Sequence, residues 1–239
     1  MLKTKLSLAS LLAFVLVGCE STRTVTSPEQ GPDDGFVSLF NGEDLTGWRG
    51  YNGGPMEGIW VAENGTLHLT AQPKGSPHAN IITEGVYDDF DLRFEWKVEA
   101  GTNSGVMFNI GEGPKQPYLT GPEYQVLDNK GFRSGKGLPV TPAEYSAGHY
   151  AVEPPFSDET KPIGEWNEGR IFVRGNHVQY WLNGVMTASY EMHSEKWNEQ
   201  IANAKFSKWK DYATLDNGHI GLQDHGHRVW FRNLRIKEL

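Results

Sequence analysis

Nine consecutive residues, from Phe90 to Val98, alternate strictly between apolar and polar side chains. In an extended chain, successive side chains point to opposite faces, so the apolar residues of this stretch share one face and the charged residues share the other. A period of two over this length indicates a half-buried β-strand. The two faces consist of Phe90, Leu92, Phe94, Trp96 and Val98 on one side and Asp91, Arg93, Glu95 and Lys97 on the other.

Similar but shorter stretches recur along the chain and predict further strands. Gly101 to Gly105 is predicted to turn the chain into the first of these strands. Gly175-Asn176 and Asn183-Gly184 suit tight hairpins, because Gly and Asn accept a positive φ at little cost. The predicted strands cover residues 106–110, 59–61, 66–70, 123–127, 169–174, 177–182, 219–223 and 228–237.

Many short strands without intervening helices predict an all-β fold. We expect a single domain, a two-sheet antiparallel β-sandwich or jelly roll, whose exposed sheet face curves into a groove. The 28 glycines and 8 tryptophans suit short strands joined by turns. Residues 191–212 are expected to form a short helix or an irregular lobe, with Trp197, Ile201, Phe206 and Trp209 as apolar anchors.

The first residues have the pattern of an export signal. Lys3 and Lys5 precede an apolar run, residues 6–17, which is too short to span a bilayer. The run ends in Gly18-Cys19, and Cys19 is the only cysteine of the 239 residues. A small residue before a cysteine at this place resembles a bacterial lipobox. We therefore predict a lipoprotein signal peptide over residues 1–18 and lipidation of Cys19.

Residues 20–35 have almost no apolar content and are predicted to form a disordered tether between Cys19 and a domain over residues 36–239. The acyl chains would anchor the protein to a membrane. Glu20, rather than Asp, follows the cysteine and favours release to the outer membrane. The expected location is exported and lipid-anchored, on the periplasmic side or the surface of the outer membrane.

The net charge of −8 argues against a nucleic-acid partner, because neutralising phosphates needs a basic surface. A neutral ligand such as a saccharide fits better. The sequence also has no nucleophile elbow, phosphate loop or dinucleotide fingerprint, so we expect no resident redox cofactor.

The strand at residues 123–127 carries the first candidate site residues. Glu123 and Gln125 share a face, and Tyr124 and Val126 share the opposite one. If the latter pair is in the core, the carboxylate and the amide point into the groove. This pair suits sugar recognition, and Glu123 is also a candidate for proton transfer.

Gln223 and His225 share a face in the same way, and a histidine is the natural base near neutral pH. None of the nearby histidines forms a recognised zinc spacing. A divalent metal ion held by Glu123, His225 or Asp224 is left open.

Five further residues are candidates for substrate binding, each with a structural alternative. Asn103 and Asp128 are amide and carboxylate groups at predicted strand ends, where turn formation is the alternative. His149 and Tyr150 lie in a loop that is rich in Gly and Pro. Trp166 is a candidate platform for a sugar ring, with packing as its alternative.

Several segments together resemble one family, the 3-keto-disaccharide hydrolase domain family. The match runs in order over residues 36–239 through 36–42 and 45–48, 89–95 with 103–105, 123–129, 164–167, 181–184, and 221–226 with 229–233. The resemblance implies a concanavalin-like jelly roll. It also implies action on glycosides whose sugar is oxidised at C3, by hydrolysis or lyase chemistry.

On such a substrate the ketone makes the C2 proton acidic, so a base removes it and the aglycone leaves from C1. His225 and Glu123 are predicted to transfer the protons, and a metal ion or Arg93 to stabilise the enolate. A separate dehydrogenase would supply the ketone. Predicted substrate contacts are Arg93, Glu95, Asn103, Gln125, Asp128, His149, Tyr150, Trp166 and Gln223.

Two alternatives to this chemistry remain at the level of sequence. A lipid-anchored carbohydrate-binding module needs no catalytic residue and uses the same kind of sandwich. A conventional glycosidase needs two carboxylates about 5–9.5 Å apart, for which Glu95 and Glu123 are the candidate pair.

Overall fold

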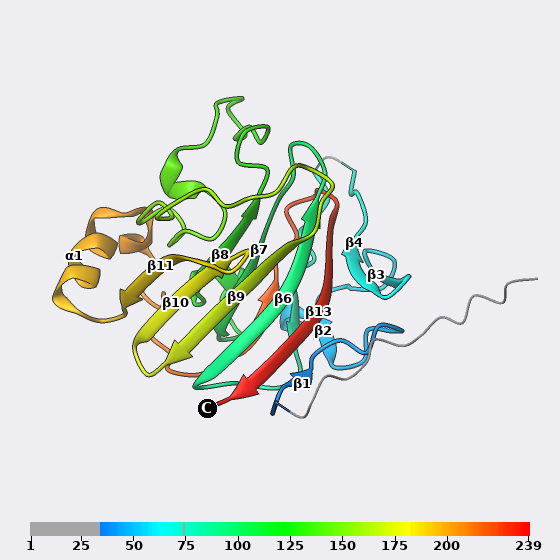
Figure 1. Cartoon of the computed structure of the whole chain (residues 1–239), viewed down its shortest axis with the longest axis horizontal. Coiled ribbons are helices and arrows are strands. Elements are labelled where there is room, and N and C mark those ends of the chain that lie inside the picture. The colour runs from blue at the N-terminus through cyan, green and yellow to red at the C-terminus, as the bar shows by residue number, and fades with distance from the viewer. Residues whose placement is uncertain (1–33, 74) are drawn as a thin grey trace, which may run out of the picture. The chain divides into compact units, whose positions relative to one another are not determined.

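A computed structural model describes residues 34–73 and 75–239, and Gly35–Leu239 forms one unit with its own core (Figure 1). The predicted signal peptide at residues 1–18, the lipidation site Cys19 and residues 20–33 of the predicted tether lie outside the described residues. Within residues 34–73 and 75–239, no helix is both long enough and apolar enough to cross a bilayer.

The larger of two antiparallel sheets has eight strands, in the order β11-β10-β9-β6-β13-β4-β3, with β1 paired to β13. Their bounds are β1 (Val37–Ser38), β3 (Trp60–Glu63), β4 (Thr66–Leu69), β6 (Phe90–Val98), β9 (Asn167–Arg174), β10 (His177–Leu182), β11 (Val185–Glu191) and β13 (Val229–Glu238).

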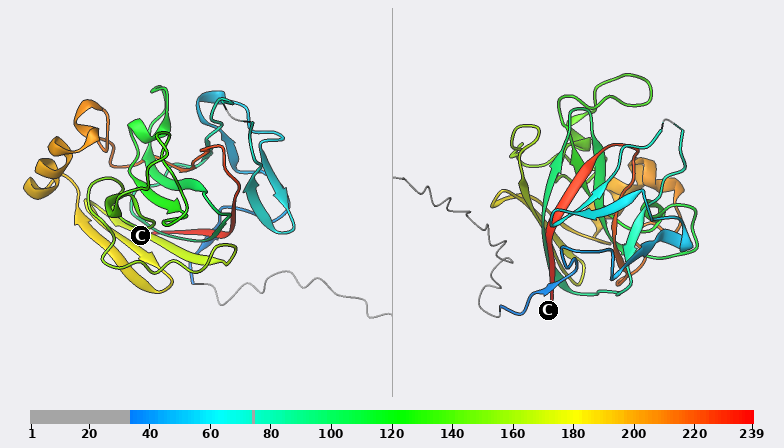
Figure 2. Two further views of the ribbon diagram at one scale, coloured as in Figure 1. Left: turned by 90° about the horizontal axis from the view of Figure 1, so that it is seen from above. Right: turned by 90° about the vertical axis from the view of Figure 1, so that its right-hand side faces the viewer.

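The smaller sheet has five strands, in the order β2-β5-β12-β7-β8. These are β2 (Trp48–Gly50), β5 (Ile81–Thr83), β7 (Asn103–Ile110), β8 (Glu123–Leu127) and β12 (His219–Leu222). The described helices are α1 (Glu195–Asn203) and the 3-10 turns η1 (Tyr51–Gly53), η2 (Pro117–Leu119), η3 (Pro142–Glu144) and η4 (Lys205–Lys208). The predicted all-β, two-sheet antiparallel sandwich is confirmed. Figure 2 shows α1 at one end of the sandwich and β3 and β4 at the other.

The core lies between the two sheets. The apolar face of β6 is buried throughout, as its alternation predicts, and it packs against the inner faces of β7 and β8. The rings of Phe90 and Phe108 meet edge to face at 6.1 Å, and those of Phe94 and Tyr124 at 5.2 Å. Such contacts add to the free energy gained from apolar burial. They fix which face of β8 is turned away from the core.

One glycine of the large sheet has no room for a side chain. Gly169 on β9 lies opposite Phe94 on β6, and a Cβ at position 169 would run into the Phe94 ring. We expect Gly169→Ala to lower the free energy of unfolding by about 1–3 kcal/mol, because the ring must leave its place in a closely packed core. Urea denaturation measures this loss. Gly135→Ala is the matched control, since a Cβ there meets nothing within 4 Å, and equal stability of the two variants would contradict the prediction.

The structure corrects the turn that the sequence predicts at residues 101–105. Of these residues, Gly101, with φ +73°, and Thr102, whose N–H donates to the Glu99 carbonyl at 3.2 Å, belong to the turn, and Asn103 to Gly105 are the first residues of β7. They pair with Leu127, Val126 and Gln125 of β8. Short polar side chains favour turns, but the Ser104 hydroxyl donates instead to the buried Gln223 carbonyl at 2.8 Å. This partner lies far away in sequence, so local turn preference is overridden.

Residues 191–212 contain both a short helix and an irregular segment, the two structures that the sequence offered as alternatives. Ser194 caps α1 by accepting a hydrogen bond from the Trp197 backbone N–H at 3.2 Å. After α1 the chain continues through η4 into an irregular segment that ends in front of β12. We call residues 195–212 the lobe.

Candidate active site

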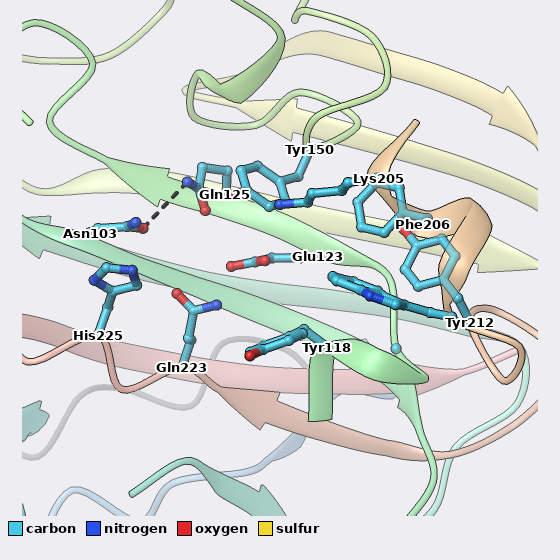
Figure 3. Close-up of a pocket in the computed structure, with 12 residues that line it drawn as sticks. Asn103, Tyr118, Glu123, Gln125, Tyr150, Lys205, Phe206, Tyr212, Gln223 and His225 are labelled. Carbon is cyan, nitrogen blue, oxygen red and sulfur yellow. Dashed lines mark hydrogen bonds between the residues drawn. The ribbon is translucent and has the colours of Figure 1, made fainter. Parts of the chain in front are cut away.

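A cavity of about 250 Å³ lies on the face of the small sheet that is turned away from the core (Figure 3). Strands β7 and β8 and the end of β12 form its floor, and η2, the loop at Tyr150 and the lobe form its walls. The lining residues are Asn103, Tyr118, Gly121, Glu123, Gln125, Tyr150, Lys205, Phe206, Trp209, Tyr212, Gln223 and His225.

Strand register brings the polar floor residues together. Gln125 lies opposite Gly105 on β7, and the backbone N–H of Gln223 donates to the Gly105 carbonyl from the other side at 2.9 Å. The Gln125 amide donates to Asn103 Oδ1 at 3.3 Å. Turned over, the same amide donates to Glu123 Oε1 at 3.2 Å. Asn103, Gln125 and Gln223 therefore line the floor of the cavity together with the Glu123 carboxyl group.

Gly105 makes the space that the Glu123 side chain occupies. A Cβ at position 105 would collide with the Glu123 carboxyl group and approach its Cγ at 2.8 Å. The backbone of β7 is therefore the surface on which this carboxyl group rests.

The carboxyl group of Glu123 is almost removed from water, with 5% of the residue exposed. Burial raises its pKa from 4.5 to about 8, and the charge of Lys205 opposes this rise in part. Glu123 makes no ion pair within 4.0 Å among the described residues. At neutral pH, Glu123 is therefore mostly protonated and is able to give up a proton.

His225 is the second titratable group at the floor. Burial, together with the neighbouring His227 and His78, lowers its pKa to about 4. The His225 and His227 rings stack at 5.6 Å, and the His78 ring lies 5.6 Å from that of His225. At neutral pH the imidazole is uncharged and can accept a proton.

An aromatic wall, defined here as Tyr118, Tyr150, Phe206, Trp209 and Tyr212, encloses the cavity above the floor. The rings of Phe206 and Tyr212 stack at 4.2 Å, and those of Tyr118 and Trp209 lie 5.5 Å apart. Lys205 Nζ lies 4.0 Å from the centre of the Tyr150 ring. Apart from Tyr150, the sequence did not identify these as site residues. Their apolar character was visible, but the packing of the lobe over the sheet was not.

Six predicted site residues meet in the cavity: Asn103, Glu123, Gln125, Tyr150, Gln223 and His225. Arg93, Glu95 and Trp166 do not line it. Arg93 and Glu95 point outward from the large sheet, where Arg93 pairs with Asp91 at 3.0 Å and Glu95 with Arg232 at 2.7 Å.

Trp166 packs under the Arg232 guanidinium, whose centre lies 4.1 Å from the ring. These outward contacts explain the polar face of β6 without a ligand.

Asp128 and His149 also lie outside the cavity. The Asp128 carboxylate accepts hydrogen bonds from the backbone N–H groups of Gly101 and Gly131, each at 2.8 Å. This is the turn-forming alternative for an aspartate at a strand end. His149 is 1% exposed and stacks on Tyr190 at 4.0 Å, behind the wall residue Tyr150.

Acid is expected to destabilise the fold through His149. Burial lowers its pKa to about 4, and neither ring nitrogen has a hydrogen-bond partner among the described residues. Below pH 6.5 the unfolded chain binds a proton at this residue that the folded chain does not, so the contribution of His149 to stability falls as pH drops from 6.5 towards 4. We expect this contribution to fall by on the order of 1–2 kcal/mol between pH 7 and 5.

Denaturation curves of the natural protein and of His149→Phe at the two pH values isolate this contribution, because the variant lacks the imidazole and should keep the ring stack with Tyr190. An unchanged pH dependence in that variant would exclude His149 as the source.

The residues considered for a metal ion are not gathered around one point. Within residues 34–73 and 75–239, no group of three His, Cys, Asp or Glu side chains is placed to hold a metal. The Asp224 carboxylate accepts hydrogen bonds from the backbone N–H groups of Ala79 and Gly226, both at 2.7 Å.

Comparison with known proteins gives a consistent result over the whole domain. Residues 35–237 match the family model of the 3-keto-alpha-glucoside-1,2-lyase-like domain. A 3-keto-disaccharide hydrolase of Bacteroides thetaiotaomicron is 33% identical over 230 residues, which cover 86% of this chain and 79% of that protein.

Two solved structures of candidate glycosyl hydrolases from Parabacteroides distasonis are also similar. One has a TM-score of 0.79 at 33% identity and covers 86% of this chain and 94% of its own. The other has a TM-score of 0.66 at 26% identity, with coverages of 85% and 99%. The chain described here therefore belongs to the family of 3-keto-alpha-glucoside-1,2-lyase-like domains.

Proposed function

We propose that the protein cleaves 3-keto-glycosides by eliminating the aglycone, with Glu123 as general acid and His225 as general base. One observation carries the proposal: a single cavity places a mostly protonated carboxyl group and an uncharged imidazole over the same strands. Family membership and the 33% identical 3-keto-disaccharide hydrolase support the class of substrate.

The reaction begins when His225 accepts the proton from C2 of the bound sugar. The electron pair of that C–H bond forms an enolate with the C3 ketone. As the enolate collapses, a double bond forms between C1 and C2 and the bond from C1 to the aglycone oxygen breaks. Glu123 donates its proton to that oxygen, so an alcohol leaves. Addition of water at C1 would complete a net hydrolysis.

The polar floor supplies groups for the developing charge. Asn103, Gln125 and Gln223 offer amide N–H donors, which stabilise an oxyanion best where water is excluded. Arg93, which the sequence suggested for this role, pairs with Asp91 on the outer face of the large sheet. The amides are therefore the better candidates within the described cavity.

The two pKa values predict the pH dependence of the reaction. The base must be unprotonated and the acid protonated, so activity should rise as pH passes about 4 and fall as it passes about 8. A plot of kcat/KM against pH should therefore be bell-shaped, with a maximum near pH 6. A rate that increases steadily through pH 8 would show that Glu123 does not act as the acid.

Release of the aglycone from a 3-keto-glucoside, with the unoxidised glucoside in parallel, tests the proposal directly. Release from the keto form alone is the expected result, because only the ketone makes the C2 proton acidic. Release from both would favour a conventional glycosidase. No release from either, by a folded protein that binds glycans, would favour the binding module.

The conventional glycosidase has little support from the geometry. Glu95 and Glu123 lie on different sheets, and Glu95 is already bonded to Arg232 and Asn233. Glu95 lines a separate groove on the outer face of the large sheet. The two carboxylates therefore do not flank one glycosidic bond.

The place of the reaction is also part of this proposal. The lipobox-like sequence at Gly18-Cys19 supports an exported protein held at a membrane by acyl chains, on the periplasmic side or the surface of the outer membrane. A 3-keto substrate requires a separate dehydrogenase that acts earlier on the sugar. Metabolic labelling with a fatty acid, compared between the natural chain and Cys19→Ala, tests the anchor.

A further inference from the structure

The cavity is divided into two chemically different ends. Figure 3 shows Asn103, Gln125, Gln223 and His225 towards one end and Phe206 and Tyr212 towards the other, with Glu123 between them. The polar end offers amide and imidazole groups that hydrogen-bond sugar hydroxyls and a ketone. Under the proposed function, this end holds the keto sugar, and the scissile bond lies at the junction beside Glu123.

The other end offers almost only aromatic rings. Phe206, Trp209 and Tyr212 belong to the lobe, and Tyr118 and Tyr150 flank Glu123 from η2 and a loop. The polar groups at this end are three tyrosine hydroxyls, the Trp209 indole N–H and Lys205, whose ammonium group lies over the Tyr150 ring. A second sugar placed here would turn some of its hydroxyl groups against aromatic carbon, which costs free energy on burial. A planar apolar group would lose no hydrogen bonds and would stack on the rings.

The size of the cavity suits a substrate of two rings. Its volume of about 250 Å³ lies just below the range of about 300–1,000 Å³ that is usual for small-molecule sites. One sugar ring and one further ring fill such a space, whereas a longer glycan would extend out of it into solvent.

From this division we infer that the aromatic wall is a leaving-group subsite that selects 3-keto-glycosides with an aromatic aglycone over 3-keto-disaccharides. The inference rests on the proposed function and adds the class of aglycone. Glu123 then lies where the aglycone oxygen separates from the sugar, which is the place an acid must occupy.

Three 3-keto-glucosides whose leaving groups are all primary alcohols provide the test: the methyl glycoside, the benzyl glycoside and a disaccharide linked through a 6-hydroxyl. Leaving groups of one chemical class keep the bond-breaking step comparable, so differences report binding at the subsite. We expect kcat/KM for the benzyl glycoside to exceed that for the other two by at least about tenfold. A disaccharide that is cleaved as well as the benzyl glycoside would overturn the inference.

Trp209→Leu probes the subsite itself while keeping the lobe packed with an apolar side chain. It should lower kcat/KM for the benzyl glycoside at least about fivefold more than kcat/KM for the methyl glycoside. Trp230→Leu is the matched control, because Trp230 is a half-buried tryptophan in β13, outside the cavity lining. Equal losses on both substrates would count against a subsite.

The outcomes separate the inference from the proposed function. If the natural chain cleaves none of the three glycosides, the proposed function fails and the inference fails with it. If it cleaves the methyl glycoside without preferring the benzyl one, only the inference fails.

Discussion

Replacing Glu123 with glutamine is expected to lower kcat/KM on methyl or benzyl 3-keto-glucoside by on the order of 10³-fold, because the amide cannot protonate a departing alkoxide at neutral pH. The substitution keeps the shape and burial of the side chain, and the hydrogen bond with a turned-over Gln125 amide can persist. Steady-state kinetics on the purified protein measure the loss. The fall in activity above pH 8 should disappear together with the acid.

A substrate with a better leaving group separates loss of the acid from general damage. Nitrophenolate departs without a proton, so Glu123→Gln should be much less impaired on 4-nitrophenyl 3-keto-glucoside than on the methyl glycoside. His225→Gln should instead impair both substrates to a similar extent, since both need removal of the C2 proton. Equal losses on both substrates in the Glu123 variant would contradict its role as acid.

Replacing Glu123 with glutamine should also change how the stability of the protein depends on pH. Burial raises the pKa of Glu123, so the folded chain holds this proton more tightly than the unfolded chain does. The contribution of Glu123 to stability is therefore lost as pH rises from 4.5 towards 8, and the glutamine variant should lack this contribution.

Adding one methyl group at Gly105 should also impair catalysis, although less than loss of the acid does. A Cβ at this position collides with the carboxyl group of Glu123 and crowds its Cγ, so the side chain must leave the surface of β7. We expect Gly105→Ala to reduce kcat/KM by on the order of 10²-fold, because displacing a proton donor by about 1 Å costs an enzyme about this much. The methyl and nitrophenyl glycosides should again respond differently.

The free energy of unfolding indicates whether Gly105→Ala acts locally. Gly105 has an extended backbone without a positive φ, so alanine there costs only the local crowding, about 1–3 kcal/mol. Gly135→Ala should leave both kcat/KM and stability unchanged. A Gly105→Ala variant with unchanged kcat/KM would show that catalysis does not depend on the position of Glu123 against β7.

The sequence predicted the sheets well where the pattern depends on a single strand. The alternation in Phe90–Val98 identified β6 with its bounds, and residues 123–127 identified β8 together with the direction of each side chain. Both follow from the period of two, which needs no knowledge of neighbouring elements. For the same reason Glu123 and Gln125 were predicted to point into a groove and Gln223 and His225 to share one face, and all four line the cavity.

Prediction from sequence failed where a residue far away in the chain determines the local structure or the direction of a side chain. Asn103 to Gly105 have turn-forming side chains, yet pairing with β8 makes them a strand. Arg93 and Glu95 have the side chains of a sugar site, but they point outward to Asp91 and Arg232. The wall residues Phe206 and Tyr212 look like ordinary core positions until the lobe is seen over the sheet. The spacing of apolar residues within the lobe does not show that the lobe packs over the sheet.

The division of the cavity between sheet and lobe has an evolutionary consequence. The acid lies on β8 and the base in the segment that follows β12, while three of the five wall residues lie in one continuous segment between β11 and β12. Substitutions, insertions or recombination within residues 195–212 can therefore change which aglycone is accepted, while the segments that bear the proton-transfer groups keep their sequence. Proteins built in this way can change their substrate range while keeping their catalytic residues.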